Sequence, residues 1–173
     1  MSVAAVYHQL IFPIHRQPEV FVPFGLQLLG VGHEFWDLGH IDLQGIDLKS
    51  PPFDFIERVV GQEKMDRLNT FRGPQGKFDI VCLSPQTPEW EEKKALFAKP
   101  HTHNEPEIRL ILEGEGLFTI RDKGAQYPTF VQRGSLLVIP SDTVHSFALT
   151  DKQTITALRV FQTKDGWVPN YLN

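Results

Sequence analysis

The C-terminal half of the chain consists of short apolar segments that alternate with turn-forming residues, and this pattern limits the possible folds more than any other feature. The segments are EIRLIL, GLFTIRD, YPTFVQR, SLLVIP, HSFALT and TITALRVFQ, and the turns include EGEG, DKGA, RGS and PSDT. β-Branched and aromatic residues favour extended backbone, whereas glycine, proline and aspartate favour turns. Short strands at this spacing predict an antiparallel β-sandwich or β-barrel.

The N-terminal half predicts a few short helices and strand pieces that pack against the barrel. FGLQLLGVGHEFWDL indicates strand pieces broken by glycines, and FDIVCLS indicates a strand. TPEWEEKKALF predicts a short helix, because proline and acidic residues come first and lysines follow. DFIERVVGQEKMDRLNTF predicts helix with two apolar stripes, and Gly61 can split it into two helices. The stripes are Phe55, Ile56, Val59 and Val60, and then Met65 and Leu68.

Length and charge restrict the classes of protein to which this chain can belong. A chain of 173 residues suits one hydrophobic core, so we expect a single domain over residues 1–173, with the N-terminal elements in 1–98 and the barrel in 99–165. The net charge of −4 and the lack of a basic run argue against a nucleic-acid partner. No apolar run approaches the roughly 20 residues that cross a bilayer.

We expect a cytoplasmic protein. The N-terminus lacks a basic leader before its apolar part, so we predict no signal peptide. The single cysteine, Cys82, cannot form an internal disulfide, which fits a reducing compartment. Its apolar neighbours predict a buried, unreactive thiol.

A polar cluster lies where one of the predicted strands begins, in KPHTHNEPEIRLIL. Residues two apart on a strand face the same side, so His101 pairs with His103, and Glu107 with Arg109. The next histidine along the chain is His145. Three imidazoles and one carboxylate suit iron, nickel or manganese, and four ligands leave two positions of an octahedral ion for a chelating substrate. The alternative is surface decoration, and four further histidines are given no role: His8, His15, His33 and His40.

The spacing of these residues resembles the two cupin motifs. HTHNEPEIRLILEG has the His-X-His, Glu and Gly pattern of the first motif, and GSLLVIPSDTVH matches the second through Gly134, Pro140 and His145. Two positions depart from the pattern, since Ala95 and Asp142 stand where the motifs have glycine. The resemblance implies a mainly β fold, a cupin-type antiparallel barrel (double-stranded β-helix or jelly roll).

Within the cupins, the sequence is similar to the acireductone dioxygenases of methionine salvage. The similarity is densest from Phe97 to Trp167 and includes the ending ALRVFQTKDGWVPN, although Pro100 replaces the usual glutamate. It implies that His101, His103, Glu107 and His145 bind one divalent metal ion per chain, Fe(2+) or Ni(2+). The implied substrates are O2 and 1,2-dihydroxy-3-keto-5-methylthiopentene. The implied products are formate and 4-methylthio-2-oxobutanoate with iron, or methylthiopropanoate, formate and CO with nickel.

The same resemblance assigns roles to residues around the metal. Arg109 would hold the anionic oxygens of the substrate, and the alternative is an ion pair with Glu107 or Glu105. Arg159 would help to neutralise the substrate dianion or orient Glu107. Phe97, Phe147 and Trp167 would wall the substrate pocket, and the alternative is that they are ordinary core residues.

Two rival functions stay open on the sequence. One is a different metal-dependent cupin dioxygenase or isomerase, and the other is a non-catalytic cupin that binds a small ligand. The C-terminal ALRVF and GWVPN segments argue against the first, and retention of all the ligands argues against the second. We expect a monomer that acts on a small molecule, with neither a nucleic-acid nor a membrane partner.

Overall fold

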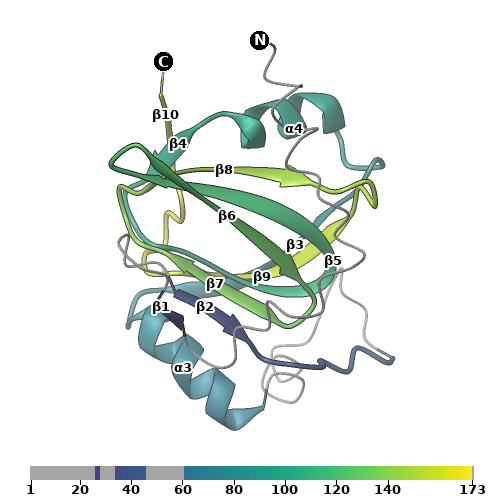
Figure 1. The fold of residues 1–173 in the computed structure, drawn as a ribbon. Coiled ribbons are helices and arrows are strands. Elements are labelled where there is room, and N and C mark those ends of the chain that lie inside the picture. Colours follow the sequence, from purple (N-terminus) through teal and green to yellow (C-terminus); the bar gives the residue numbers. More distant parts are fainter. Residues whose placement is uncertain (1–25, 28–33, 46–60, 173) are drawn as a thin grey trace.

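The computed structural model describes residues 26–27, 34–45 and 61–172, and these form an antiparallel β-structure with two helices (Figure 1). The helices are α3 (Gln62–Arg72) and α4 (Trp90–Ala98). The strands are β1 (Leu26–Gln27), β2 (Glu34–Asp37), β3 (Lys77–Leu83), β4 (His101–His103), β5 (Glu107–Asp122), β6 (Ala125–Gln132), β7 (Ser135–Ile139), β8 (Val144–Leu149), β9 (Ile155–Phe161) and β10 (Pro169–Tyr171).

The long strand β5 joins the two halves of the structure. Its first part pairs with β7 and β9, and its second part pairs with β6 and β8. We expected two strands here, separated by a turn at EGEG, and that expectation is wrong. A β-bulge between Ile111 and Glu113 and a positive φ of 78° at Gly114 bend the strand from one sheet to the other without ending it.

Two groups of strands therefore face each other across an interior (Figure 1). One group runs β1-β2-β7-β5-β9-β3, and the other runs β6-β5-β8-β4-β10. All pairings among the described strands are antiparallel. This arrangement confirms the predicted mainly β, cupin-type barrel with a few short helices from the N-terminal half.

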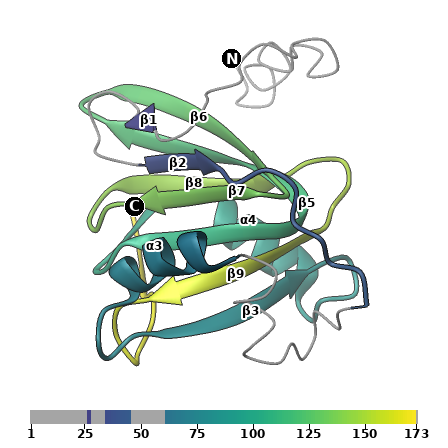
Figure 2. The same ribbon diagram turned by 90° about the horizontal axis from the view of Figure 1, so that it is seen from below.

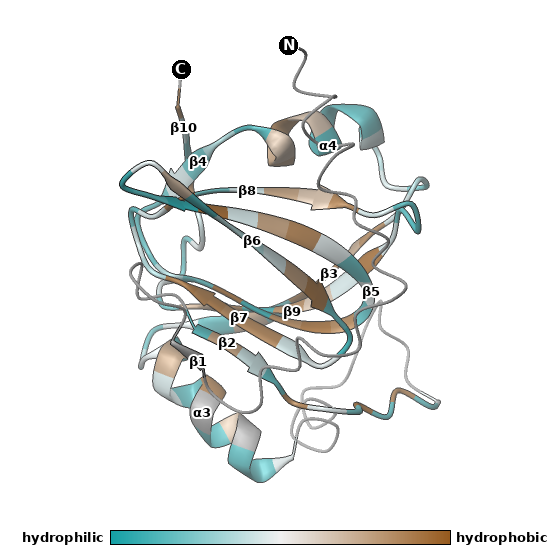
Figure 3. Cartoon of the chain, in the orientation of Figure 1, coloured by the Kyte–Doolittle hydropathy of each residue, from teal (hydrophilic) through white to brown (hydrophobic). Residues whose placement is uncertain are grey.

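The alternation of side chains along β5 builds two cores, seen as apolar bands on the strands in Figure 3. Ile108, Leu110 and Leu112 face outward and pack with Met65 and Leu68 of α3. Figure 2 shows α3 lying across the outside of this sheet. The interior is filled by Ile111 before the bulge and by Phe118 and Ile120 after it, together with residues from β3, β6, β7 and β9, because the bulge reverses which positions of β5 face inward. Glu107 and Arg109 belong to the inward parity, so the strand aims them into the barrel.

The described helices agree with the sequence analysis. The α3 helix begins directly after Gly61, and Met65 and Leu68 are buried as predicted. The stripe predicted over residues 55–60 lies outside the described residues. Neither helix in the described part of the chain has the length and apolar character needed to cross a membrane.

The predicted burial of Cys82 is wrong, because its side chain is exposed. Among the described strands, β3 pairs with β9 alone and so lies at the edge of its sheet. Alternation along the strand turns Leu83 into the core and Cys82 outward.

Candidate metal centre

Three histidines and one glutamate from different strands meet inside the barrel. His101 and His103 lie on β4, Glu107 begins β5, and His145 lies on β8. His101 and His145 are directly opposite each other in the β4–β8 pairing. All four side chains are buried, and one possible ligand atom from each lies within 4.8 Å of the others. The structure therefore brings together the four residues that the sequence predicted as ligands.

Backbone carbonyls fix the orientation of two of the rings. His101 Nδ1 lies 2.8 Å from the Lys99 carbonyl, and His145 Nδ1 lies 2.8 Å from the Thr143 carbonyl. A ring that donates through Nδ1 can present the lone pair of Nε2 to a metal. His103 Nδ1 is buried and has no hydrogen-bond partner among the described residues. Its Nε2 lies 3.0 Å from Glu107 Oε2.

The Glu107 carboxylate divides its two oxygens between different partners. Oε1 accepts from Nε of Arg109 in a short ion pair, and Oε2 lies 2.8 Å from His145 Nε2. Burial would raise the pKa of the Glu107 carboxyl, but Arg109, His145 and His103 outweigh it and hold that pKa well below its usual range. The carboxylate is therefore ionised and can act as a metal ligand.

The pKa values of His101 and His145 are shifted in opposite directions. Burial lowers the pKa of His101 below its ordinary value, which favours the neutral ring that a metal needs. Burial also acts to lower the pKa of His145, but the Glu107 carboxylate and the Thr143 carbonyl raise it overall. A metal ion binding at this ring therefore competes with a proton.

The donor set and its spacing fit a divalent transition metal. Ligand bonds of about 2.1 Å separate neighbouring donors by about 3 Å and opposite donors by about 4.2 Å in octahedral geometry. The three ring centroids lie 4.5 to 5.1 Å apart, and Glu107 Oε2 already lies within 3.0 Å of two ring nitrogens. A mixed imidazole and carboxylate set of this kind suits iron or nickel.

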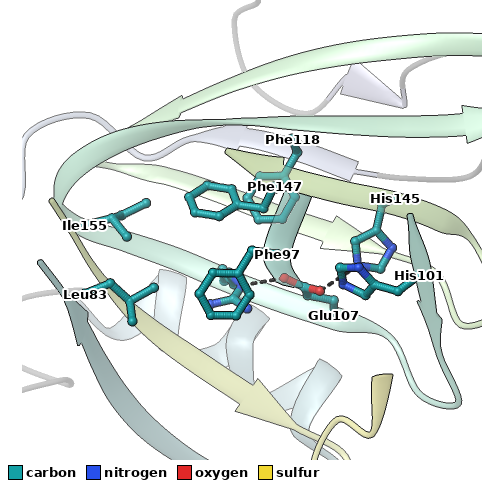
Figure 4. A pocket seen from close by; sticks show the side chains of 9 residues that line it. Leu83, Phe97, His101, Glu107, Phe118, His145, Phe147 and Ile155 are labelled. Atoms are coloured by element: carbon teal, nitrogen blue, oxygen red, sulfur yellow. Dashed lines mark hydrogen bonds and ion pairs between the residues drawn. The ribbon is translucent and has the colours of Figure 1, made fainter. Parts of the chain in front are cut away.

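A pocket opens beside this cluster, with polar residues at one end and apolar residues at the other (Figure 4). His101, Glu107, Arg109 and His145 form the polar end. The apolar end is lined by Leu83, Phe97, Phe118, Phe147 and Ile155. Two of the three predicted pocket aromatics, Phe97 and Phe147, thus line the pocket. Sequence reasoning missed Leu83, Phe118 and Ile155, although Phe118 faces the same side as Phe147 in the β5–β8 pairing.

The third predicted aromatic, Trp167, lies next to the cluster and outside the pocket lining. Its ring centroid is 5.8 Å from that of His103, and its Nε1 donates to the Pro106 carbonyl at 3.0 Å. The guanidinium carbon of Arg109 lies 4.8 Å from the indole centroid, and that of Arg159 lies 5.8 Å from it. Trp167 therefore packs against both arginines.

The two predicted arginines have different partners. Arg109 takes the ion pair with Glu107 that we considered as the alternative, and it also lines the pocket. Arg159 donates through Nε and Nη2 to the two carboxylate oxygens of Asp79, each at 2.7 Å. One predicted role of Arg159 was to orient Glu107. In the structure, Arg109 makes that contact. The sequence did not predict a role for Asp79. Asp79 lies next to Arg159 only because β3 pairs with β9 in the folded chain.

The loop between β4 and β5 is held by a buried carboxylate that sequence reasoning left unassigned. Glu105 accepts hydrogen bonds from the backbone N–H groups of Gln162 and Thr163 at 2.8 and 3.0 Å, and from the Thr163 hydroxyl at 3.3 Å. The side chain is 5% exposed. These bonds tie the loop between the two ligand-bearing strands to the end of β9.

One departure from the second cupin motif has a structural explanation. Asp142 replaces a glycine and has a φ of 59°, in the left-handed region that favours glycine but that aspartate tolerates. Its N–H donates to the His103 carbonyl at 2.8 Å. The turn thus keeps its shape and its contact with a ligand residue.

Comparisons with known proteins agree with this site. The family model described as "ARD/ARD' family" matches residues 53–169. An acireductone dioxygenase of Exiguobacterium sibiricum is 33% identical over 145 residues, covering 82% of this chain and 80% of the relative. One from Bacillus cereus is 32% identical over 157 residues, covering 88% and 91%.

A solved structure of an acireductone dioxygenase is also similar to this chain. An acireductone dioxygenase from Bacillus anthracis with a cadmium ion in its active centre superposes with a TM-score of 0.65 at 29% identity, covering 80% of this chain and 82% of that one. The family match spans more than half of the sequence and includes all four residues of the buried cluster. This chain belongs to the ARD/ARD' family.

Proposed function

We propose that this chain is an acireductone dioxygenase of methionine salvage that uses O2 to cleave 1,2-dihydroxy-3-keto-5-methylthiopentene. The observation that carries the proposal is the buried cluster of His101, His103, Glu107 and His145 at the polar end of a half-apolar pocket. The expected products are formate and 4-methylthio-2-oxobutanoate with iron, or methylthiopropanoate, formate and CO with nickel.

The four cluster residues would hold the metal through three Nε2 atoms and Glu107 Oε2. When bound, the divalent ion supplies Lewis acidity and a template for two oxygens of the substrate. The carbonyls of Lys99 and Thr143 keep two of the rings in the ligating orientation, and Arg109 keeps Glu107 ionised and aimed at the same point.

Arg109 is also placed to bind the substrate. Its side chain lines the pocket, and because Glu107 occupies its Nε, the terminal amino groups can donate to an anionic substrate oxygen. Arg159 lies against the same indole and adds positive charge near the site, although Asp79 offsets part of it. Both arginines thus favour a dianionic substrate.

The apolar residues keep bulk water away from the reacting atoms. Phe97 and Phe147 lie edge to face, with ring centroids 6.5 Å apart, and Phe118 packs behind Phe147 at 4.8 Å. A low-dielectric wall strengthens the charge interactions at the polar end and keeps water from reactive intermediates. Trp167 supports this wall indirectly, by packing on Arg109 and His103.

We also propose a cytoplasmic monomer with one domain over residues 1–173. All four proposed ligands come from one chain, so a second copy is not needed to complete the site. Sedimentation of the metal-loaded protein at a single concentration-independent mass of one chain would support the monomer. A mass that rises with concentration would count against it.

The function is tested by adding the acireductone anaerobically to protein loaded with iron or nickel. We expect a change in absorbance before oxygen is admitted, and formation of formate after aeration, with CO only in the nickel form. Binding without any turnover would favour the non-catalytic rival. Turnover of other substrates but not of acireductones would favour a different cupin enzyme.

The ligand assignment is tested separately with His103→Ala and a matched control, His40→Ala. His40 is exposed and far in sequence from the cluster, so its loss should leave metal content and turnover unchanged. His103→Ala should lose both together. Full metal content in His103→Ala would contradict the assigned ligand set.

A further inference from the structure

Gly116 on β5 lies against the ring of Phe147, at the apolar end of the pocket. A Cβ built on Gly116 would lie 2.3 Å from Cε2 and 2.5 Å from Cζ of Phe147, and 3.2 Å from the Ala148 carbonyl oxygen. Carbon atoms in contact keep about 3.5 to 4.0 Å apart. Any side chain at this position would therefore displace the ring.

The backbone does not itself require glycine here. Gly114, two residues earlier, has a φ of 78° and contacts backbone of Thr154 and Ile155, so it needs glycine for its conformation and for the close approach. Gly116 lies in regular strand pairing opposite Leu149 and does not have a positive φ. What Gly116 provides is space for Phe147.

The Phe147 ring can move in few directions. Phe118, directly opposite it in the β5–β8 pairing, is 2% exposed and packs on it with centroids 4.8 Å apart. A ring pushed away from β5 would move toward the pocket that it lines with Phe97 and Ile155 (Figure 4). Adding one methyl group at residue 116 would thus narrow the apolar end and leave the polar end unchanged.

We infer that Gly116 determines substrate specificity, because its missing side chain lets Phe147 recede and makes room for the apolar tail of the substrate. This rests on the proposed function, in which the enediol end of an acireductone lies at the polar end and its tail lies among Leu83, Phe118, Phe147 and Ile155. The residue acts through Phe147 and does not touch the reacting atoms. Gly116 therefore determines how large a substrate tail the pocket can hold, and it does so without altering metal binding.

The test compares Gly116→Ala with the unsubstituted protein, both loaded with iron, on acireductones with a methyl or a methylthioethyl tail. We expect unchanged metal content and a kcat/KM for the methyl tail within about threefold of the unsubstituted value. The kcat/KM for the methylthioethyl tail should fall by at least about tenfold, the size of effect that one carbon has in an apolar pocket. The loss should appear mainly in KM, because the tail is remote from the reacting atoms.

Two further variants make the result specific. Phe147→Leu removes the ring atoms that meet residue 116. In the double variant Gly116→Ala, Phe147→Leu, the kcat/KM for the methylthioethyl tail relative to the methyl tail should therefore return most of the way to its value in the unsubstituted protein. Thr119 lies on the opposite face of β5 from Gly116, so Thr119→Val should leave the kcat/KM for both tails unchanged. Equal losses for both tails in Gly116→Ala, or no recovery in the double variant, would overturn the inference.

The inference stays testable if Gly116→Ala does not fold. Phe147→Leu alone should then widen the pocket and raise the relative kcat/KM for a longer pentyl tail, and an unchanged tail preference would overturn the inference. Absence of turnover with every tail in the unsubstituted protein would overturn the proposed function as well. Normal turnover with tail preferences that none of the variants changes would overturn this inference alone.

Discussion

Arg109 and Glu107, two residues apart on the inward face of β5, form an ion pair that uses one carboxylate oxygen and leaves the other for the histidines. Arg109 Nε contacts Oε1, whereas Oε2 lies within 3.0 Å of Nε2 of both His103 and His145. The guanidinium thus fixes the rotation of the carboxylate. It also supplies the positive charge that keeps this fully buried group ionised.

Replacing Arg109 with Gln should weaken metal binding although no ligand is lost. Partners that orient a metal ligand are typically worth about 10- to 100-fold in metal affinity, and we expect a loss in that range. Competition with a chelator of known affinity measures it. Arg133→Gln is the matched control, because Arg133 is more exposed and contacts the Leu112 carbonyl, away from the cluster. Unchanged affinity in Arg109→Gln would contradict the orienting role.

Removing the metal should lower the thermal stability of the protein. A metal that binds the folded state and not the unfolded one stabilises by mass action, by about 2.7 kcal/mol at a free concentration one hundred times its Kd. Calorimetry with and without a chelator should therefore show a lower Tm for the metal-free protein. His103→Ala should show little difference between the two conditions. An equally large Tm difference in that variant would place the stabilising metal elsewhere.

Replacing Glu105 with Ala should destabilise the fold more than most substitutions in a loop. The change leaves the N–H groups of Gln162 and Thr163 without their acceptor, and an unsatisfied buried donor costs about 1 to 3 kcal/mol. We expect the free energy of unfolding in urea to fall by about 2 to 4 kcal/mol. Glu105→Gln keeps one carbonyl oxygen as an acceptor, so its free energy of unfolding should fall by less.

The matched control for Glu105 is Glu113→Ala, at a side chain that is 57% exposed. Glu113 makes an exposed ion pair with Arg133 at 4.0 Å, and such pairs typically contribute about 0 to 1 kcal/mol, so we expect a smaller loss than for Glu105→Ala. Equal effects of Glu105→Ala and Glu113→Ala would show that the buried hydrogen bonds contribute nothing.

Asp79 and Arg159 should stabilise each other across the β3–β9 pair. The contact is bidentate and both side chains are about one-third exposed, so we expect a coupling free energy of about 1 kcal/mol. A double-mutant cycle with Asp79→Ala and Arg159→Ala measures this coupling in urea unfolding. Additive effects of the two substitutions would indicate that solvent screens the pair completely.

Local sequence pattern was sufficient to predict much of the fold. Strand alternation predicted that His101 and His103 share a face and that Glu107 and Arg109 share another, because side chains on a strand alternate strictly. Helix signals predicted α3 and α4 where they occur among the described residues. The pattern misjudged β5, because a glycine pair in a strand can mark either a turn or a bulge, and only pairing with other strands decides between them.

The metal cluster itself was predictable for a different reason. Its spacing matches a motif in which two histidines and a glutamate are close in sequence, so only His145 had to be placed across the fold. Contacts between distant strands had no such signal. Asp79 meets Arg159, and Glu105 meets Thr163, only because β3, β9 and the β4–β5 loop come together in the barrel.

The sequence by itself determined which neighbouring side chains share a strand face and which residues can ligate a metal, because both follow from residue type and short-range spacing. The tertiary structure alone decided which charge each arginine meets and how wide the apolar end of the pocket is. Those properties depend on the packing of strands that are far apart in the chain, as when Gly116 of β5 makes room for Phe147 of β8. Packing distances of a few tenths of an ångström are set by the whole barrel and cannot be read from local sequence.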